Sequence, residues 1–232
     1  PPNCEANWQR RIHGPPIPWG KIWPTLGTPL SDATEERNWR KLLHRALFVR
    51  NRDPKAQTHA CRLRCGDPDE SMLHLINCRH TRPYWDAVTS FVTNILGTPN
   101  ERFVDRLIIF NTAGRNLKVV SVEACAFIRH AVNCFYRDFA MVDTHDHAFT
   151  WERTFEDAMH SYRSAVLAWA QSIRVFTAIR RYTHQKKRVS EDTLRKFEKL
   201  VTFSDEGTTF ALTAAFKSAI AQAESAAAAK RT

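Results

Sequence analysis

The segment Cys61–Cys78 reads CRLRCGDPDESMLHLINC and concentrates cysteine and histidine in a short stretch of chain. Cys61 and Cys65 are separated by three residues, and His74 and Cys78 by another three. Side chains at positions i and i+4 are neighbours on one face of a helix. A helical turn at the end of this segment would therefore aim His74 and Cys78 at the same point.

This cluster predicts a structural zinc site. Structural Zn²⁺ is held in a tetrahedron, commonly by three cysteines and one histidine. Gly66, directly after the first cysteine pair, permits the tight backbone bend that a cysteine loop requires. A catalytic zinc keeps one coordination position open, whereas Cys61, Cys65, His74 and Cys78 fill all four. We therefore expect these four residues to bind a structural ion.

Two alternatives are open at this point. His59 and His80 flank the cluster, and either could replace His74 or support a ligand from outside the coordination sphere. The cysteines could instead be buried apolar side chains next to an incidental histidine, because cysteine is among the most buried residue types. The spacing of the ligand-type residues favours the metal site.

The chain around the cluster predicts a mainly α fold. It has only seven glycines, and 43% of its residues are hydrophobic, which is typical of a folded protein. We expect an extended arm rich in proline and tryptophan over residues 1–30 and a zinc-binding helical module over residues 31–100. A bundle of long helices, with a basic segment and an alanine-rich C-terminal helix, is expected over residues 101–232.

Apolar residues at helical spacing predict individual helices within these regions. They are expected over residues 33–48, 83–96, 119–141, 150–182 and 210–229. Residues 103–110 fit either a helix or a strand. Ser31 or Asp32 is expected to cap the first helix. The prolines of residues 1–30 exclude regular helix there, so the tryptophans of this arm are expected to dock it onto an apolar surface.

The formal net charge is +10, which favours a polyanionic partner, either nucleic acid or an anionic membrane surface. The sequence contains no apolar run of the ~18 residues that a membrane span requires, and no secretory signal at its start. Cysteines outside the cluster are scattered, which favours a reducing intracellular compartment without distinguishing mitochondrion from nucleus. The chain begins with Pro1, as expected of a processed or truncated product.

The region from residue 19 to residue 85 resembles a known module. A helix-forming stretch begins at Trp39, the Cys65-Gly66 pair and a Glu-x-x-x-His pattern from Glu70 follow, and Trp85 closes the motif. This pattern is similar to the zinc-binding region that lies C-terminal to the polymerase in reverse transcriptases of non-LTR (LINE-type) retrotransposons. The first cysteine pair has one extra residue between its members, and the His–Cys gap is one residue shorter than is common there. The resemblance implies the same four zinc ligands.

The resemblance implies binding and not polymerisation, because the chain contains no Tyr-x-Asp-Asp polymerase motif. No Gly-x-Ser-x-Gly nucleophile motif is present either, and we expect no enzyme. The leading expectation is a non-catalytic, zinc-containing RNA-binding component of a ribonucleoprotein such as a (mitochondrial) ribosome. The alternatives are a nucleic-acid-binding part of a retrotransposon reverse transcriptase, or a scaffold subunit among other protein subunits of a large assembly, with a purely structural zinc.

The basic residues expected to contact phosphates form two groups. The first surrounds the metal cluster and comprises Arg62, Arg64, Arg79 and Arg82. The second follows the long helix over residues 150–182 and comprises Arg180, Arg181, Lys186, Lys187 and Arg188. Aromatic residues interleaved with the second group suit stacking on bases. The alternative for the second group is a solvated helix end, where cations complement the helix dipole.

Overall fold

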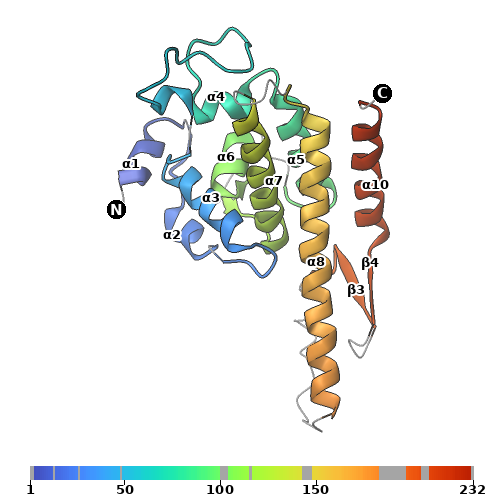
Figure 1. Ribbon diagram of the computed structural model, residues 1–232. Helices are drawn as coiled ribbons and strands as arrows, with labels where there is room; N and C mark the ends of the chain where they lie inside the picture. Colours follow the sequence, from blue (N-terminus) through green and yellow to red (C-terminus); the bar gives the residue numbers. More distant parts are fainter. Residues whose placement is uncertain are drawn as a thin grey trace.

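The computed structural model describes residues 3–12, 14–25, 27–47, 49–99, 104–114, 117–142, 148–182, 197–204 and 209–230. For residues 176–182 it describes the backbone alone. This part of the chain is mainly helical, as predicted, and its strands are short (Figure 1). No helix in it is both long enough and apolar enough to cross a membrane.

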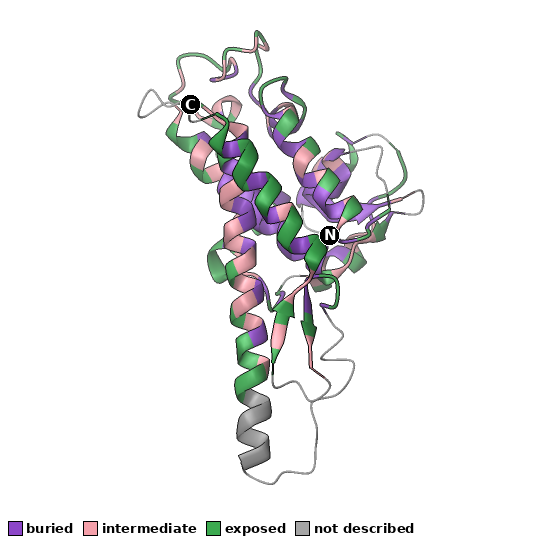
Figure 2. Ribbon diagram, turned by 90° about the vertical axis from the view of Figure 1, so that its right-hand side faces the viewer, coloured by how far each residue is buried: buried purple, intermediate pink, exposed green. Residues whose placement is uncertain are grey.

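The bundle is built around helix α7 (Val122–Met141), which lies between α3 (Ala33–Leu43) and α8 (Trp151–Tyr182). Helix α10 (Ala214–Ala228) packs against the other side of α8 (Figure 1). Helix α7 is buried over most of its length, whereas α8 and α10 are exposed on their outer faces (Figure 2). The apolar spacing that predicted these helices is the spacing that fills this core.

Shorter elements complete the structure. Helices α4 (Met72–Asn77), α5 (Arg82–Asn94) and α6 (Val104–Phe110) pack against one another, so the apolar stretch over 103–110 is helical where it is described. The described residues contain two sheets, each an antiparallel pair of strands. They join β1 (Thr112–Ala113) to β2 (Lys118–Val119), and β3 (Val201–Phe203) to β4 (Phe210–Leu212).

The expectation of an extended N-terminal arm is wrong. Asn3–Gln9 forms helix α1, Trp19–Ile22 forms α2, and Trp23–Thr25 forms a 3₁₀ turn, η1. The prolines between α1 and α2 fall outside both helices, so they do not oppose them. Trp8 of α1 is buried, and its indole N–H donates to the carbonyl of Leu43 at 2.7 Å. The segment does wrap the bundle, but as short helices.

Several predicted helix boundaries also shift. The helix expected from residue 119 begins at Val122, because Val119 belongs to β2. Helix α3 ends at Leu43 and not at residue 48, because Arg45 adopts a left-handed backbone conformation with φ of 55°. Helix α10 begins at Ala214 and not at residue 210, because Phe210–Leu212 pairs with β3. Pro83 lies in the first turn of α5, where its missing N–H has no intrahelical partner to lose.

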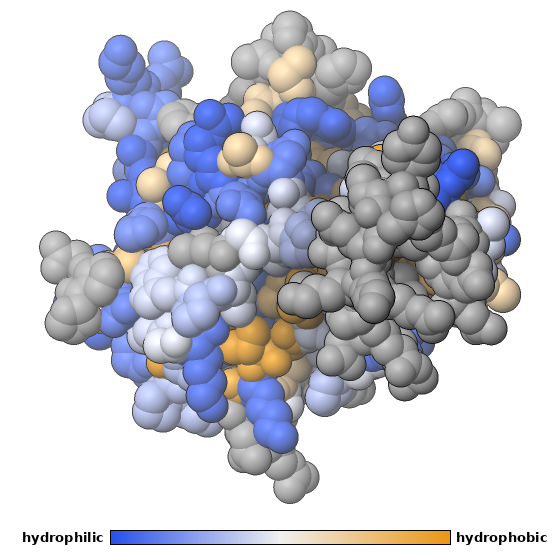
Figure 3. Space-filling model, turned by 90° about the horizontal axis from the view of Figure 1, so that it is seen from below, coloured by the Kyte–Doolittle hydropathy of each residue, from blue (hydrophilic) through white to orange (hydrophobic). Residues whose placement is uncertain are grey.

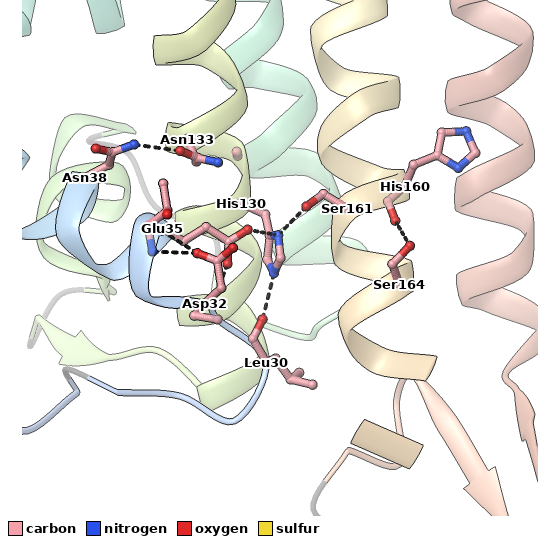
Figure 4. Close-up of polar contacts among 12 residues, drawn as sticks. Leu30, Asp32, Glu35, Asn38, His130, Asn133, His160, Ser161 and Ser164 are labelled. Carbon is pink, nitrogen blue, oxygen red and sulfur yellow. Dashed lines mark hydrogen bonds and ion pairs between the residues drawn. The ribbon is translucent and has the colours of Figure 1, made fainter. Parts of the chain in front are cut away.

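A buried polar network ties the start of α3 to α7 and α8 (Figure 4). Glu35 closes a capping box, with one carboxylate oxygen accepting from the backbone N–H of Asp32 at 2.9 Å. Its other oxygen lies 2.5 Å from Nδ1 of His130, which also lies 2.9 Å from the hydroxyl of Ser161. Nε2 of His130 lies 2.7 Å from the carbonyl oxygen of Leu30. Both ring nitrogens therefore lie at hydrogen-bond distance from oxygen atoms, and the ring joins Glu35, Ser161 and the Leu30 carbonyl.

We predict that His130→Ala lowers the free energy of unfolding by about 3–5 kcal/mol, because it leaves the Glu35 carboxylate buried without its partner. Urea denaturation would measure this loss. The matched control is Asn133→Ala in the same helix. It removes the one hydrogen bond that the Asn38 side chain donates to Asn133, and it should lower the free energy of unfolding by about 1 kcal/mol. Equal losses in the two variants would show that the network contributes no more than an ordinary hydrogen bond.

Candidate metal centre

The structure brings Cys61, Cys65, His74 and Cys78 together. Their ligand atoms all lie within 4.8 Å of one another. A tetrahedral ion with bonds of about 2.0–2.3 Å requires ligand atoms roughly 3.3–3.8 Å apart. Sγ of Cys65 and Nε2 of His74 are 3.3 Å apart. The four residues thus form a cluster compatible with one metal ion, as the spacing predicts.

Two local structures position these ligands. The cysteine loop turns through Arg64 and Gly66, whose φ angles of 54° and 94° are both left-handed and direct Cys65 back towards Cys61. Only the glycine of this turn was foreseen. On the other side of the site, helix α4 carries His74 and places Cys78 at its C-cap.

Helix α4 is short, and its ends are fixed by specific hydrogen bonds. The hydroxyl of Ser71 accepts from the backbone N–H of His74 at 3.1 Å and caps the first turn. The backbone N–H of Cys78 donates to the carbonyl of His74 at 2.6 Å. This bond closes the helical turn between the two ligands and accounts for the predicted i,i+4 arrangement.

Asp67 orients the histidine ligand from outside the cluster. Its carboxylate lies 3.0 Å from Nδ1 of His74, so Nε2 is the nitrogen that faces the cysteines. The backbone N–H of Asp67 points to Sγ of Cys65 at 3.5 Å, and its carbonyl accepts from the N–H of Cys61 at 3.0 Å. A carboxylate behind a ligating histidine is a common feature of metal sites. Asp67 was not among the residues singled out from the sequence.

Burial controls the protonation of the thiols. It raises the pKa of Cys61 to about 12, and it also raises the pKa of Cys78. Both thiols are therefore protonated at neutral pH while no ion is bound. Because a metal ligates the thiolate, metal binding displaces these protons and becomes tighter as the pH rises.

Arg62 does not serve the role expected for it. It was predicted to contact nucleic acid, but it is only 7% exposed. Its guanidinium donates to the carboxylate of Glu70 at 2.7 Å and lies 4.4 Å from the centre of the Phe139 ring on α7. The Glu70 carboxylate also accepts the backbone N–H of Arg50 at 3.0 Å and that of Arg62 at 2.9 Å. This buried pair attaches the cysteine loop to the bundle.

The other basic residues near the cluster lie at the surface. Arg64 and Arg79 are exposed, and Arg82 is half-buried and bridges to Asp86 at 2.8 Å. His59 and His80 are also exposed and lie outside the group of four, so the structure selects His74 over both.

Most of the second predicted basic group lies beyond what the structure describes. Arg180 and Arg181 lie in the last part of α8, residues 176–182, of which only the backbone is described. Lys186, Lys187 and Arg188 lie outside the described residues. Their contact with nucleic acid stays a prediction.

Comparison of the chain with models of known protein families, with characterised proteins and with solved structures finds no match. The interpretation of the cluster therefore depends on its own donor atoms and geometry. Three thiols and an imidazole, closed around a common centre, can hold a thiophilic ion in a fixed position.

We expect Asp67→Asn to weaken zinc binding about tenfold, because the uncharged amide orients and polarises His74 less strongly than the carboxylate. Competition with a chromophoric chelator at pH 7 would measure the change. Asp69→Asn is the matched control, since Asp69 is an exposed carboxylate in the same loop. An equal effect of both substitutions would indicate a loss of general electrostatic attraction and not a specific contact.

Saturation with zinc should raise the free energy of unfolding. At a free concentration of about 1,000 times Kd, a ligand that binds only the folded chain contributes about 4 kcal/mol. Thermal unfolding with and without a chelator would measure this stabilisation. A Cys78→Ser variant should lose most of it, and stabilisation that persists in that variant would show that zinc binds elsewhere.

Proposed function

We propose that the chain is a non-catalytic, zinc-containing RNA-binding protein that serves as a structural component of a ribonucleoprotein, such as a mitochondrial ribosome. The observation that carries the proposal is the closed cluster of Cys61, Cys65, His74 and Cys78 in a chain of net charge +10. Thiolate and imidazole ligands in a tetrahedral arrangement favour zinc. With all four positions filled by protein groups, the ion has no open site for a substrate, which supports a structural role.

The distribution of exposed side chains supports a polyanionic partner. Among the residues whose exposure is described, only Val122, Met141 and Val175 are large hydrophobic side chains classed as exposed. The lower face is largely hydrophilic where it is described, with a small hydrophobic area near its centre (Figure 3). Arg64 and Arg79 are exposed and lie next to the metal cluster in the sequence. Exposed cations of this kind contact phosphates and fix the orientation of a nucleic acid.

The alternative of a protein scaffold draws on two features that suit docking onto a protein, the tryptophans of the N-terminal segment and the alanine-rich C-terminal helix. Trp8 is buried against the chain's own core, and Trp19 and Trp23 pack partly against it. These rings are therefore largely occupied within the chain, which favours the RNA-binding proposal. The alternative of a piece of a reverse transcriptase shares the zinc site and the nucleic-acid partner, so the same experiment addresses it.

We predict that the zinc-loaded protein binds structured RNA with an affinity that falls steeply with salt. Each phosphate neutralised contributes roughly 0.7–0.9 to the slope of log K against log salt concentration. Titrations of fluorescent RNA, duplex DNA and single strands at several salt concentrations would measure this slope, with bound zinc quantified in parallel. Weak, salt-independent binding to every nucleic acid, with one zinc per chain, would overturn the RNA-binding proposal and favour the scaffold.

A further inference from the structure

Helix α3 has a buried apolar side and an exposed cationic side. Trp39, Leu42 and Leu43 are buried against the core. Arg37, Arg40, Lys41 and His44 occur at positions i, i+3, i+4 and i+7, and all four are exposed. Residues at this spacing share one face of a helix, so the four form a continuous stripe on the side away from the bundle. We call this stripe the α3 surface.

The α3 surface is hollowed. Arg37, Arg40, Lys41 and His44 line one depression of about 460 Å³. The carboxylate in that lining is Glu36, whose Oε1 accepts from the backbone N–H of Thr28 at 3.2 Å and whose Oε2 lies 3.9 Å from the Arg40 guanidinium. Two arginines and one lysine therefore line the depression with a single carboxylate that is already engaged. A negatively charged occupant would complement it.

An aromatic cluster of His44, Trp23 and Trp19 lies at the end of the same surface. The ring of His44 lies 5.7 Å from that of Trp23, at an interplanar angle of 33°. Trp23 in turn stacks on Trp19 at 5.6 Å and 24°, and its indole N–H donates to Glu5 at 2.8 Å. The Trp19–Trp23 pair is thus held in place, and His44, whose ring is tilted against that of Trp23, is the exposed member of the cluster. Histidine rings of this kind stack with unpaired bases.

Positive charge continues beyond His44. Burial, with a further contribution from the nearby Arg11 and Arg52, lowers the pKa of Arg45. The Arg45 guanidinium lies 5.6 Å from the ring centre of Trp8. Several like charges thus lie near the C-terminal end of α3, where a polyanion would relieve their repulsion.

We propose that the α3 surface binds a single strand of nucleic acid, with phosphates on Arg37, Arg40 and Lys41 and a base stacked on His44. Binding without sequence preference requires a cationic track for the backbone and an aromatic platform for bases, and both are present here. A paired duplex hides its bases from such a platform, so we assign a single strand. This inference rests on the proposed RNA-binding function and identifies the surface of the protein that binds the strand.

The test compares two triple variants of the full-length, zinc-loaded chain. Arg37→Gln/Arg40→Gln/Lys41→Gln removes the cations of the α3 surface. The control Lys118→Gln/Arg153→Gln/Lys217→Gln removes the same charge from exposed positions on other elements. At about 0.1 M salt we expect the first variant to bind a fluorescent oligouridine at least tenfold more weakly, with a salt slope smaller by about 2. The control should change the Kd by less than about threefold.

A second variant tests the stacking of a base on His44. His44→Ala should weaken binding of the oligouridine about fivefold or more and leave the salt slope unchanged, because stacking releases no counterions. Binding of a duplex of equal length should not change. Thermal unfolding of each variant verifies that it is folded.

The outcomes separate the inference from the function it rests on. If the parental chain binds RNA and the α3 triple variant binds it with the same affinity and salt slope, the α3 assignment is overturned and the proposed function stands. A parental chain that binds no nucleic acid would overturn both. Tighter binding of duplex than of single strand, or equal competition by polyglutamate, would overturn the assignment of a single strand as the occupant. Equal binding of RNA and DNA single strands would support the assignment of a single strand.

Discussion

The position of the metal cluster on the bundle depends on one buried ion pair. The carboxylate of Glu70 is completely buried and would be strongly destabilising without compensation. The guanidinium of Arg62 and two backbone N–H groups supply this compensation, and Arg62 also packs on the ring of Phe139 in α7. The Glu70 carboxylate therefore fixes the cysteine loop through the Arg62 side chain and backbone. The Arg62–Glu70 ion pair orders a loop that has little apolar surface of its own, and an ion held by the four cluster residues would order it further.

Buried arginines fix the N-terminal segment by the same principle. Arg106 of α6 donates to the carbonyl of Pro15, and Arg129 of α7 donates to that of Thr25 while lying 4.5 Å from the ring centre of Trp39. Proline has no N–H to donate, so a proline-rich segment has fewer backbone donors than carbonyl acceptors. Guanidinium groups from the bundle satisfy two of them instead. Part of the positive charge counted in the sequence is thus used inside the protein, and only the exposed remainder can attract a polyanion.

Local patterns in the sequence predicted what depends on neighbouring residues. The four ligands followed from spacing, and the long helices from apolar periodicity. The pairing of Arg62 with Phe139 and of Glu35 with His130 joins segments far apart in the chain, and no local pattern predicts which residues meet. The N-terminal helices were missed because α1 and α2 are too short to show a period and depend on tertiary contacts such as that of Trp8 with Leu43. The β3–β4 pair was missed because strands of three residues carry no usable alternation.

The α3 surface differs from a flexible basic tail because the helix that carries it is fixed at both ends. Its first turn is held by the contact of Glu35 with His130, and its last turn by the indole of Trp8 on the carbonyl of Leu43. Arg52, next to Arg45, belongs to the 3₁₀ turn η2 (Arg50–Arg52), which Glu70 holds through the backbone N–H of Arg50. The cysteine loop thus helps to set where this cation lies. The α3 surface and the cysteine cluster therefore belong to one rigid frame, and an ion held by the cluster would act on the proposed nucleic-acid affinity through that frame and not by contact.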